Sequence, residues 1–445
     1  MTLSSLTRGM PPLSPRTGPG RRMAVLLAGA AALVLYVAPG FSAPGSHWPL
    51  RDVRVYWWGG QHASQALYSA HAEFSFTYPP FAAALFRLGS SGTEGWLAAV
   101  ITVVSIGALV ALVWMSLAAA GVRPRPETVF AIAALSALLW PVAYTLHLGE
   151  INLVVAVLVG WDLLRERDGA WWQGIGTGVA AGIKLTPLIF VVYLLITRRP
   201  RAAATAAGAF AATIAAGWLL LPAASRVFWL DGVFAAQSRV GNVANPSNQS
   251  LAGAVARLAG DRLTGAHDWW LAAAVICGLA GLAVAAWAHR RGWRLGGVCC
   301  CAITGLLVSP FSWAHHWVWA VPLLIWTATT AWRHRSVTGG AATAVVAVVF
   351  SGLIPLTWPG RPVNPARMVA SDLYVLCGLA VLAATAVVLT RQRRPPGPPR
   401  TASPGLDEWT RAPSTRRGRP SARPQQPDRP ASDPPPYTLV RCAAP

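Results

Sequence analysis

Long apolar blocks alternate with short polar connectors through most of the chain, from residue 23 to residue 390. The blocks are roughly 17 to 25 residues long, which as α-helix is enough to cross about 30 Å of hydrocarbon. The pattern therefore predicts about 10 full membrane spans. The predicted spans cover residues 23–39, 94–120, 128–146, 150–164, 200–222, 268–289, 295–310, 314–332, 340–357 and 370–390.

The apolar block at 171–197 is different, because arginine-bearing connectors flank it on both sides while it is too short for two crossings. Two half-helices with a break at residues 182–187 would satisfy both observations, since such breaks are tolerated where the backbone lines a cavity. Lys184 lies in this break. An ionisable group there is costly and is a candidate for neutralising a phosphate, although it can also snorkel to an interface.

Composition supports a membrane protein. Hydrophobic residues make up 54% of the chain and charged residues 12%, whereas soluble domains carry about a quarter charged residues. We expect an all-α polytopic membrane protein with about 10–12 transmembrane helices. The formal charge of +21 lies largely in the tails and connectors, where arginine sets orientation, so we do not expect a nucleic-acid partner.

The arginine-bearing connectors alternate with arginine-poor ones, which predicts the orientation of the spans by the positive-inside rule. We expect a cytoplasmic N-terminal tail at 1–22, an uncleaved first span, a transmembrane domain at 23–390 and a disordered Pro/Arg-rich cytoplasmic tail at 391–445. The remaining loops would face outward, at residues 40–80, 147–150, 223–267, 310–316 and 358–369. Most of the unusual polar chemistry lies in these loops, so the active face should be extracytoplasmic.

Asp52 is the leading catalytic candidate, because it lies among arginines and aromatic residues just outside the first predicted span. A carboxylate at that position can accept the proton of a sugar hydroxyl as the hydroxyl attacks an anomeric carbon. The alternative is an ordinary ion pair with Arg51 or Arg54 in a solvated loop.

Other polar groups of the outer loops have weaker signals. His315 and His316 can bind a phosphate or assist proton transfer, or they belong to an aromatic belt; at helical spacing only one of them should face the site. Asn248 and Gln249 suit sugar hydroxyls but are also ordinary turn residues. Glu150 fits equally well as a helix N-terminal acid.

Cysteine and metal signals are weak. Five of the six cysteines lie in apolar blocks and the sixth in the C-terminal tail, without disulfide or zinc spacing. The outer loops offer few carboxylates at ligand spacing, so we expect neither a metal nor another cofactor.

Several short motifs in order resemble the actinobacterial membrane mannosyltransferases of glycosyltransferase family 87, in the GT-C superfamily. The matching segments are RDVRVY at 51–56, LY at 67–68, FTYPP at 76–80, GIKLTP at 182–187, NQSL at 248–251 and the stretch from Ser309 to His316. One position departs from the resemblance, because the family more often has glutamine where this chain has Glu150. We therefore expect no shared role for that side chain.

The resemblance implies a GT-C fold and transfer of mannose from polyprenyl-phosphate-mannose to an extracytoplasmic lipid-linked or cell-envelope glycan, with an α-(1→2) linkage and inversion. It carries the catalytic aspartate over to Asp52. The expected substrate-binding residues are Arg51, Arg54, Tyr56, Tyr78, Lys184, Asn248, Gln249, His315 and His316. The competing hypothesis is a secondary transporter or lipid flippase, suggested by the broken segment, but the polar groups concentrate in outer loops and the halves show no correspondence.

Overall fold

The computed structural model describes residues 50–63, 67–68, 75–165, 170–260, 266–354, 356 and 365–391. The predicted span at 23–39, both predicted tails, and most of the loop at 358–369 lie outside these residues. The described residues form helices and no β-strand; their β-structure is limited to an isolated antiparallel bridge between Asn248 and Trp313.

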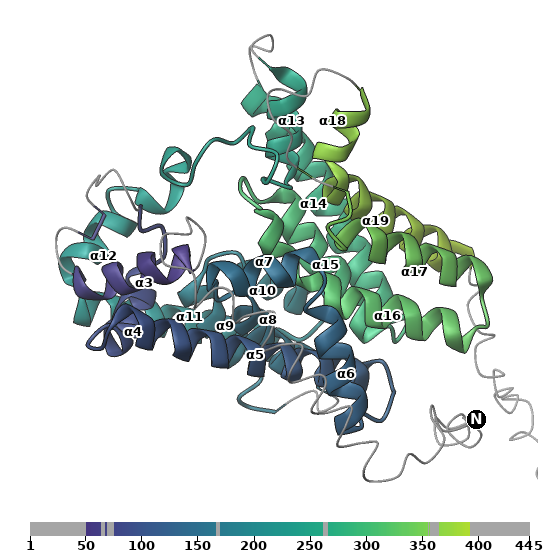
Figure 1. The fold of residues 1–445 in the computed structure, drawn as a ribbon, viewed down its shortest axis with the longest axis horizontal. Coiled ribbons are helices and arrows are strands. Elements are labelled where there is room, and N and C mark those ends of the chain that lie inside the picture. Colours follow the sequence, from purple (N-terminus) through teal and green to yellow (C-terminus); the bar gives the residue numbers. More distant parts are fainter. Residues whose placement is uncertain are drawn as a thin grey trace, which may run out of the picture. The chain divides into compact units, whose positions relative to one another are not determined.

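Most of the described helices follow one another closely along the chain (Figure 1). In chain order they are α3 (Arg51–Gln61), α4 (Pro80–Gly89), α5 (Glu94–Ala119), α6 (Pro126–Ser136), α7 (Trp140–Leu148), α8 (Asn152–Leu163), α9 (Ile175–Ile183), α10 (Leu188–Ile196), α11 (Pro200–Leu220), α12 (Pro222–Trp229), η2 (Val233–Ala235), η3 (Gln237–Arg239), α13 (Leu251–Ala259), α14 (Ala266–Arg290), α15 (Arg294–Val308), η4 (Ala314–Trp319), α16 (Ala320–Arg333), α17 (Val337–Phe350), α18 (Pro365–Ser371) and α19 (Leu373–Arg391).

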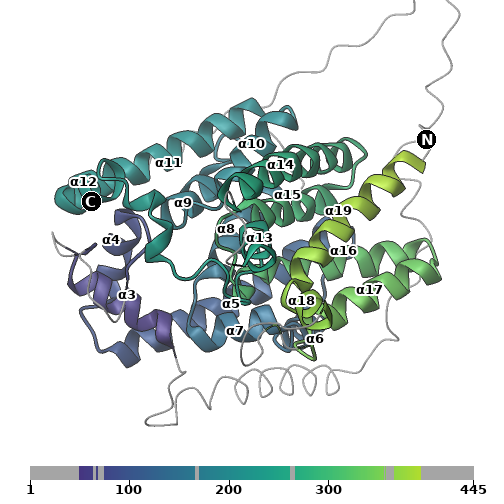
Figure 2. The same cartoon turned by 90° about the horizontal axis from the view of Figure 1, so that it is seen from above.

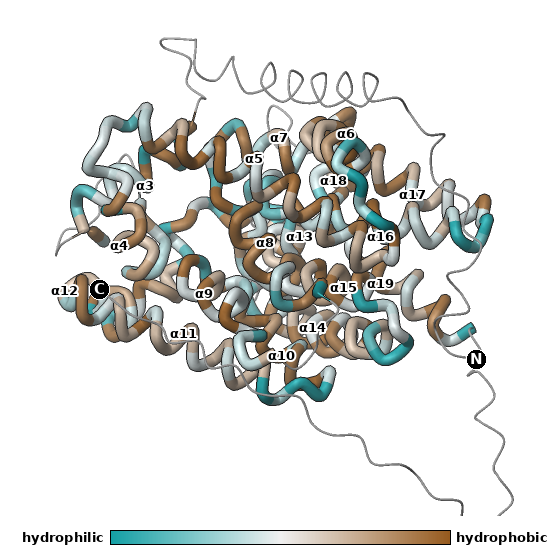
Figure 3. Tube along the Cα trace, turned by 90° about the horizontal axis from the view of Figure 1, so that it is seen from below, coloured by the Kyte–Doolittle hydropathy of each residue, from teal (hydrophilic) through white to brown (hydrophobic). Residues whose placement is uncertain are grey.

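Four described helices, α5, α11, α14 and α19, are long and apolar enough to cross a membrane. A fifth span is possible if α6 and α7 count as one, although they meet at an angle of 82°. The predicted spans are more numerous because the other apolar blocks form shorter helices, among them α8, α15 and α17. Figure 3 shows apolar residues along the helices and hydrophilic ones gathered mainly at their connections.

The predicted break in the 171–197 block is confirmed. Helix α9 ends at Ile183, Lys184 is extended with φ −147° and ψ 126°, and α10 begins at Leu188 just after Pro187. A proline is preorganised for a helix start and cannot continue a preceding helix, so it separates the two halves. Both halves pack against α11.

The core forms where α5, α8, α9, α15 and α16 meet. Leu109 and Leu112 of α5 and Leu153 and Val159 of α8 are fully buried there. Because lipid tails are as apolar as these side chains, their contacts between membrane helices stabilise the fold by van der Waals packing. Helices α3, α4 and α12 lie close together on the other side of α5 and α11, as two perpendicular views show (Figures 1 and 2).

Gly149 fixes the approach of α3 to the turn between α7 and α8. Its φ is +68°, which L side chains rarely adopt, and a Cβ there would lie 2.4 Å from Val53 Cγ2. The Leu50 N–H donates to the carbonyl of His147 at 3.0 Å and so holds the start of α3 to the same turn. Asp52, in the first turn of α3, is thereby set close to the start of α8.

Candidate active site

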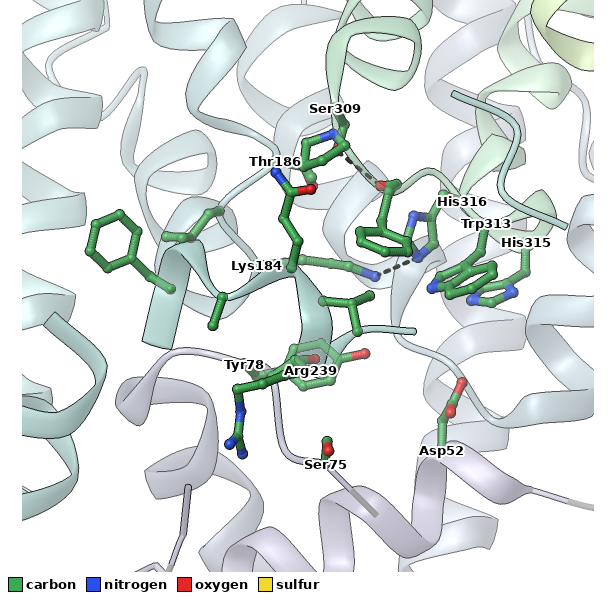
Figure 4. Close-up of a pocket in the computed structure, with 18 of the residues that line it drawn as sticks. Asp52, Ser75, Tyr78, Lys184, Thr186, Arg239, Ser309, Trp313, His315 and His316 are labelled. Carbon is green, nitrogen blue, oxygen red and sulfur yellow. Dashed lines mark hydrogen bonds between the residues drawn. The ribbon is translucent and has the colours of Figure 1, made fainter. Parts of the chain in front are cut away.

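A cavity of about 980 Å³ lies where the predicted outer loops meet (Figure 4). This is at the upper end of the roughly 300–1,000 Å³ usual for small-molecule sites. Its polar lining comes from α3, the segment before α4, the break between α9 and α10, η3, and the stretch from Ser309 to His316. Segments that are far apart in the sequence therefore contribute to one site.

Asp52 lines the cavity, and its carboxylate accepts no hydrogen bond from the described residues. Burial and the Glu150 charge raise the pKa of the Asp52 carboxyl to about 7, against the opposing charges of Lys184 and Arg51. A carboxylate with a pKa near neutrality suits a general base, because it is ionised yet still basic enough to accept a proton.

Glu150 forms the centre of a buried hydrogen-bond network behind the cavity wall. Its Oε1 accepts hydrogen bonds from the hydroxyls of Tyr56, at 2.7 Å, and Tyr78. Lys184 Nζ lies 3.3 and 3.4 Å from its two oxygens. Burial alone would raise the pKa of Glu150, but Lys184, His315 and the two tyrosines together hold it below its usual range. Glu150 is therefore ionised at neutral pH.

Lys184 joins this network to the histidines. Its ammonium donates to Asn152 Oδ1 at 2.8 Å and lies 3.2 Å from His316 Nε2. Burial lowers the pKa of His316, and the neighbouring ammonium lowers it further. The imidazole is thus neutral and its Nε2 accepts from Lys184. Three donors of the ammonium are matched by three acceptor groups of the protein.

Both histidines line the cavity, although helical spacing predicted that only one would face it. They lie on the short 3₁₀ segment η4, which runs along the cavity wall, and their rings are perpendicular with centroids 4.8 Å apart. The His315 carbonyl accepts from Thr145 and Asn152, at 2.8 and 3.0 Å. Burial lowers the pKa of His315 to about 4, so this ring is also neutral.

The other predicted site residues fall into separate groups. Arg51 and Tyr78 line the cavity. Tyr56 is not in the lining, but its hydroxyl donates to Glu150 behind the cavity wall. Arg54 is not in the lining, since its exposed guanidinium pairs with Glu94 at 2.9 Å. Arg54 therefore pairs with Glu94 and not with Asp52, the partner considered from the sequence.

Asn248 and Gln249 are fully buried, and their side chains bind the protein's own backbone. Asn248 Nδ2 donates to the carbonyls of Val243 and Pro310, and its Oδ1 accepts from the Ser312 N–H. Gln249 connects in the same way to the α18–α19 junction. These contacts fix the loop that carries the histidines. Because both side chains are buried and bonded to the backbone, this arrangement does not support the predicted contacts to sugar.

One cluster has the residue types of a metal site. Potential ligand atoms of Glu150, His315 and His316 all lie within 4.8 Å of one another. Lys184 already bonds Glu150 and His316, so a divalent ion would have to displace a resident positive charge. The donor set does not fit a cation without that rearrangement.

Sequence reasoning missed two residues of the site. Glu150 was discounted because of its departure from the family pattern, and Arg239 of η3, which lines the cavity, was not considered. Arg239 did carry a signal, because an arginine in a loop predicted to face outward goes against the positive-inside pattern.

The family of the chain follows from comparison with known proteins. The model of glycosyltransferase family 87 matches residues 76–310, more than half of the chain. The chain belongs to glycosyltransferase family 87. This membership makes it a membrane glycosyltransferase and disfavours the transporter hypothesis. No solved structure is a significant match.

Curated relatives of this family 87 member include two proteins of Mycobacterium tuberculosis. A polyprenol-phosphate-mannose-dependent alpha-(1-2)-phosphatidylinositol pentamannoside mannosyltransferase is 37% identical over 258 residues, or 56% of this chain and 58% of that protein. A polyprenol-phosphate-mannose-dependent alpha-(1-2)-phosphatidylinositol mannoside mannosyltransferase is 32% identical over 351 residues, or 72% and 78%. The first match thus spans less than two thirds of the relative's length, and the second spans more.

Proposed function

We propose that this family 87 glycosyltransferase moves mannose from polyprenyl-phosphate-mannose to a hydroxyl of an extracytoplasmic glycolipid or cell-envelope glycan, forming an α-(1→2) linkage. The supporting observation is that Asp52, with a pKa near neutrality, lines the same cavity as the neutral His315 and His316. The names of the curated relatives support the donor, the linkage and a phosphatidylinositol mannoside as the acceptor.

The reaction is a direct displacement at the anomeric carbon. Asp52 accepts the proton of the acceptor hydroxyl, whose oxygen forms a bond to mannose C1. The bond from C1 to the phosphate oxygen breaks, and its electron pair leaves with the polyprenyl phosphate. General-base catalysis contributes about 10²–10⁴-fold to such a step, and basic groups at the cavity stabilise the departing anion.

Glu150 and the tyrosines act indirectly in this scheme. The carboxylate and Asn152 hold the Lys184 ammonium beside His316, so the cavity wall next to the reacting sugar has fixed polarity. Preorganised charges of this kind stabilise developing charge without the cost of reorienting water. The extracytoplasmic orientation is part of the proposal and is supported by the arginine distribution of the connectors.

Transfer of radiolabelled mannose by membranes that express the chain tests the proposal. Polyprenyl-phosphate-mannose is supplied as donor with phosphatidylinositol mannosides as acceptors, and GDP-mannose is tested separately with synthesis of the lipid donor blocked. We expect transfer from the lipid donor only, and its loss in Asp52→Asn. Asp268→Asn is the matched control, because Asp268 is exposed and does not line the cavity.

Retained transfer in a folded Asp52→Asn protein would contradict the assignment of the base. Absence of transfer by folded wild-type protein, with any of these acceptors, would contradict the donor or the acceptor class.

A further inference from the structure

Arg239 stands out among the basic residues of the cavity because part of its guanidinium is shielded from solvent without a partner among the described residues. It is the last residue of η3, and it lines the cavity. Its Nε and Nη2 atoms are out of contact with solvent and donate to no acceptor among the described residues. A buried cationic donor without an acceptor is unfavourable, so a group that completes this arrangement is expected.

The two unpaired nitrogens form one edge of the guanidinium. Their N–H bonds point in the same direction, and this geometry matches two oxygens of a phosphate or carboxylate in a bidentate contact. In Figure 4 the Arg239 guanidinium extends past Tyr78, away from the Lys184 ammonium. Burial raises the pKa of the nearby Tyr68 phenol, and the Arg239 charge opposes that rise. These observations place the positive charge near Tyr68 and Tyr78.

Lys184, the phosphate ligand suggested by the sequence, is less suited to this role. Its ammonium already donates to Glu150 and Asn152 and contacts His316 Nε2. Arg257, another arginine of the same predicted outer region, is also fully engaged: it pairs with Asp372 and donates to the carbonyls of Asn245 and Asn248. In the part of the chain that the structure describes, Arg239 has no such set of acceptors.

We propose that Arg239 is the phosphate-binding residue of the cavity and takes two oxygens of a lipid phosphate through its Nε and Nη2 edge. The inference rests on the proposed function, which brings lipid phosphates to this cavity. Because both atoms are shielded in the present arrangement, the guanidinium turns toward the cavity when the anion binds. The phosphate belongs either to the polyprenyl donor or to a phosphatidylinositol headgroup, since both present the same chemistry.

Binding of sugar-free lipids to the purified full chain in nanodiscs separates these sources. The probes are polyprenyl phosphate, the uncharged polyprenol, and phosphatidylinositol, each titrated into wild type, Arg239→Gln and Arg239→Lys. Arg226→Gln is the matched control, because Arg226 is exposed, lies on the nearby helix α12 and does not line the cavity. Melting temperatures of all variants verify folding.

We expect Arg239→Gln to weaken binding of one phosphate lipid by about 10- to 100-fold, the range for a charged hydrogen-bonded contact. Polyprenol should bind all variants equally. Arg239→Lys should recover only part of the loss, because a point charge cannot make the two-point contact. Loss with polyprenyl phosphate would assign the donor phosphate, and loss with phosphatidylinositol would assign the acceptor phosphate.

If wild type and Arg239→Gln bind both phosphate lipids equally, the inference is overturned. If Arg239→Lys binds as tightly as wild type, the two-point contact is overturned. These outcomes are separable from failure of the proposed function. Arg239-dependent lipid binding without mannose transfer leaves the phosphate site in place and removes the function. Mannose transfer without Arg239-dependent lipid binding supports the proposed function and removes the phosphate site.

Discussion

Replacing Glu150 by glutamine tests whether the buried network controls the pKa of Asp52, the proposed catalytic base. The Glu150 charge is the second largest cause of the raised Asp52 pKa, after burial, whereas Lys184 acts in the opposite direction. Removing the carboxylate charge therefore lowers the Asp52 pKa, because this repulsion disappears while the attraction of Lys184 for the ionised carboxylate remains. A neighbouring charge typically moves a pKa by about 1 unit or more.

The measurable consequence is a shift of the acidic limb of the rate profile. Transfer requires ionised Asp52, so kcat/KM in the wild type should rise with pH through a midpoint of about 7. In Glu150→Gln the midpoint should fall by roughly 1 pH unit. Glu150 itself adds no second limb in this range, because its pKa is held low. The assay is transfer of labelled mannose by purified protein between about pH 5 and pH 9, a range that brackets the raised pKa.

Stability provides the second readout for the same position. Glutamine keeps one oxygen that can accept from Tyr56, Tyr78 and Lys184, so Glu150→Gln should fold. Glu150→Ala leaves the Lys184 ammonium without its counterion and should cost about 3–5 kcal/mol. Glu94→Gln is the control, since Glu94 forms an exposed pair with Arg54 and lies outside the cavity. An unchanged acidic limb in an active Glu150→Gln protein would refute the electrostatic argument.

Three further substitutions test other parts of the structure. Asp52→Asn should raise the melting temperature more above pH 7 than at pH 5, because the raised carboxyl pKa makes ionisation oppose folding, and this cost grows as the pH rises from 3.8 to about 7; an equal effect at both pH values would contradict the assigned shift. Gly149→Ala should cost about 2–5 kcal/mol, from its positive φ and the overlap with Val53, as measured by thermal unfolding. Asn248→Ala should cost about 3 kcal/mol or more by leaving buried backbone groups unpaired, with the KM for donor unchanged at a permissive temperature.

The all-α membrane class could be predicted from the sequence because it depends on local hydropathy and on the length of apolar blocks. The interruption at 182–187 was predictable for a similar reason, since flanking charge and chain length together require it. Among the described residues, fewer helices than predicted spans are long and apolar enough to cross a membrane on their own. Hydropathy does not reveal bends such as the 82° angle between α6 and α7, which depend on how the helices pack.

The candidate site was predictable only in part. Asp52, Tyr78, Lys184 and the histidines were identified because they lie in polar interruptions that resemble the family motifs. The role of Glu150 was not, because its partners Tyr56 and Lys184 are 94 and 34 positions away, and contacts over such separations cannot be inferred from one sequence. Its departure from the family pattern also suggested irrelevance, whereas glutamate and glutamine can fill the same acceptor position.

The candidate site residues lie on two kinds of structure. This difference explains why the proposed base should be held rigidly while the proposed phosphate-binding residue, Arg239, can move. Asp52, Glu150 and Lys184 lie at the beginnings or ends of helices packed into the core, so their positions are fixed to within the rigidity of those helices. Arg239 lies instead on a single 3₁₀ turn in the long segment between α12 and α13, and its donors are not engaged by the described residues. A base must be held within hydrogen-bond reach of the hydroxyl that it deprotonates. A phosphate at the end of a long flexible lipid must first be captured, and a residue that can turn toward it is suited to that task.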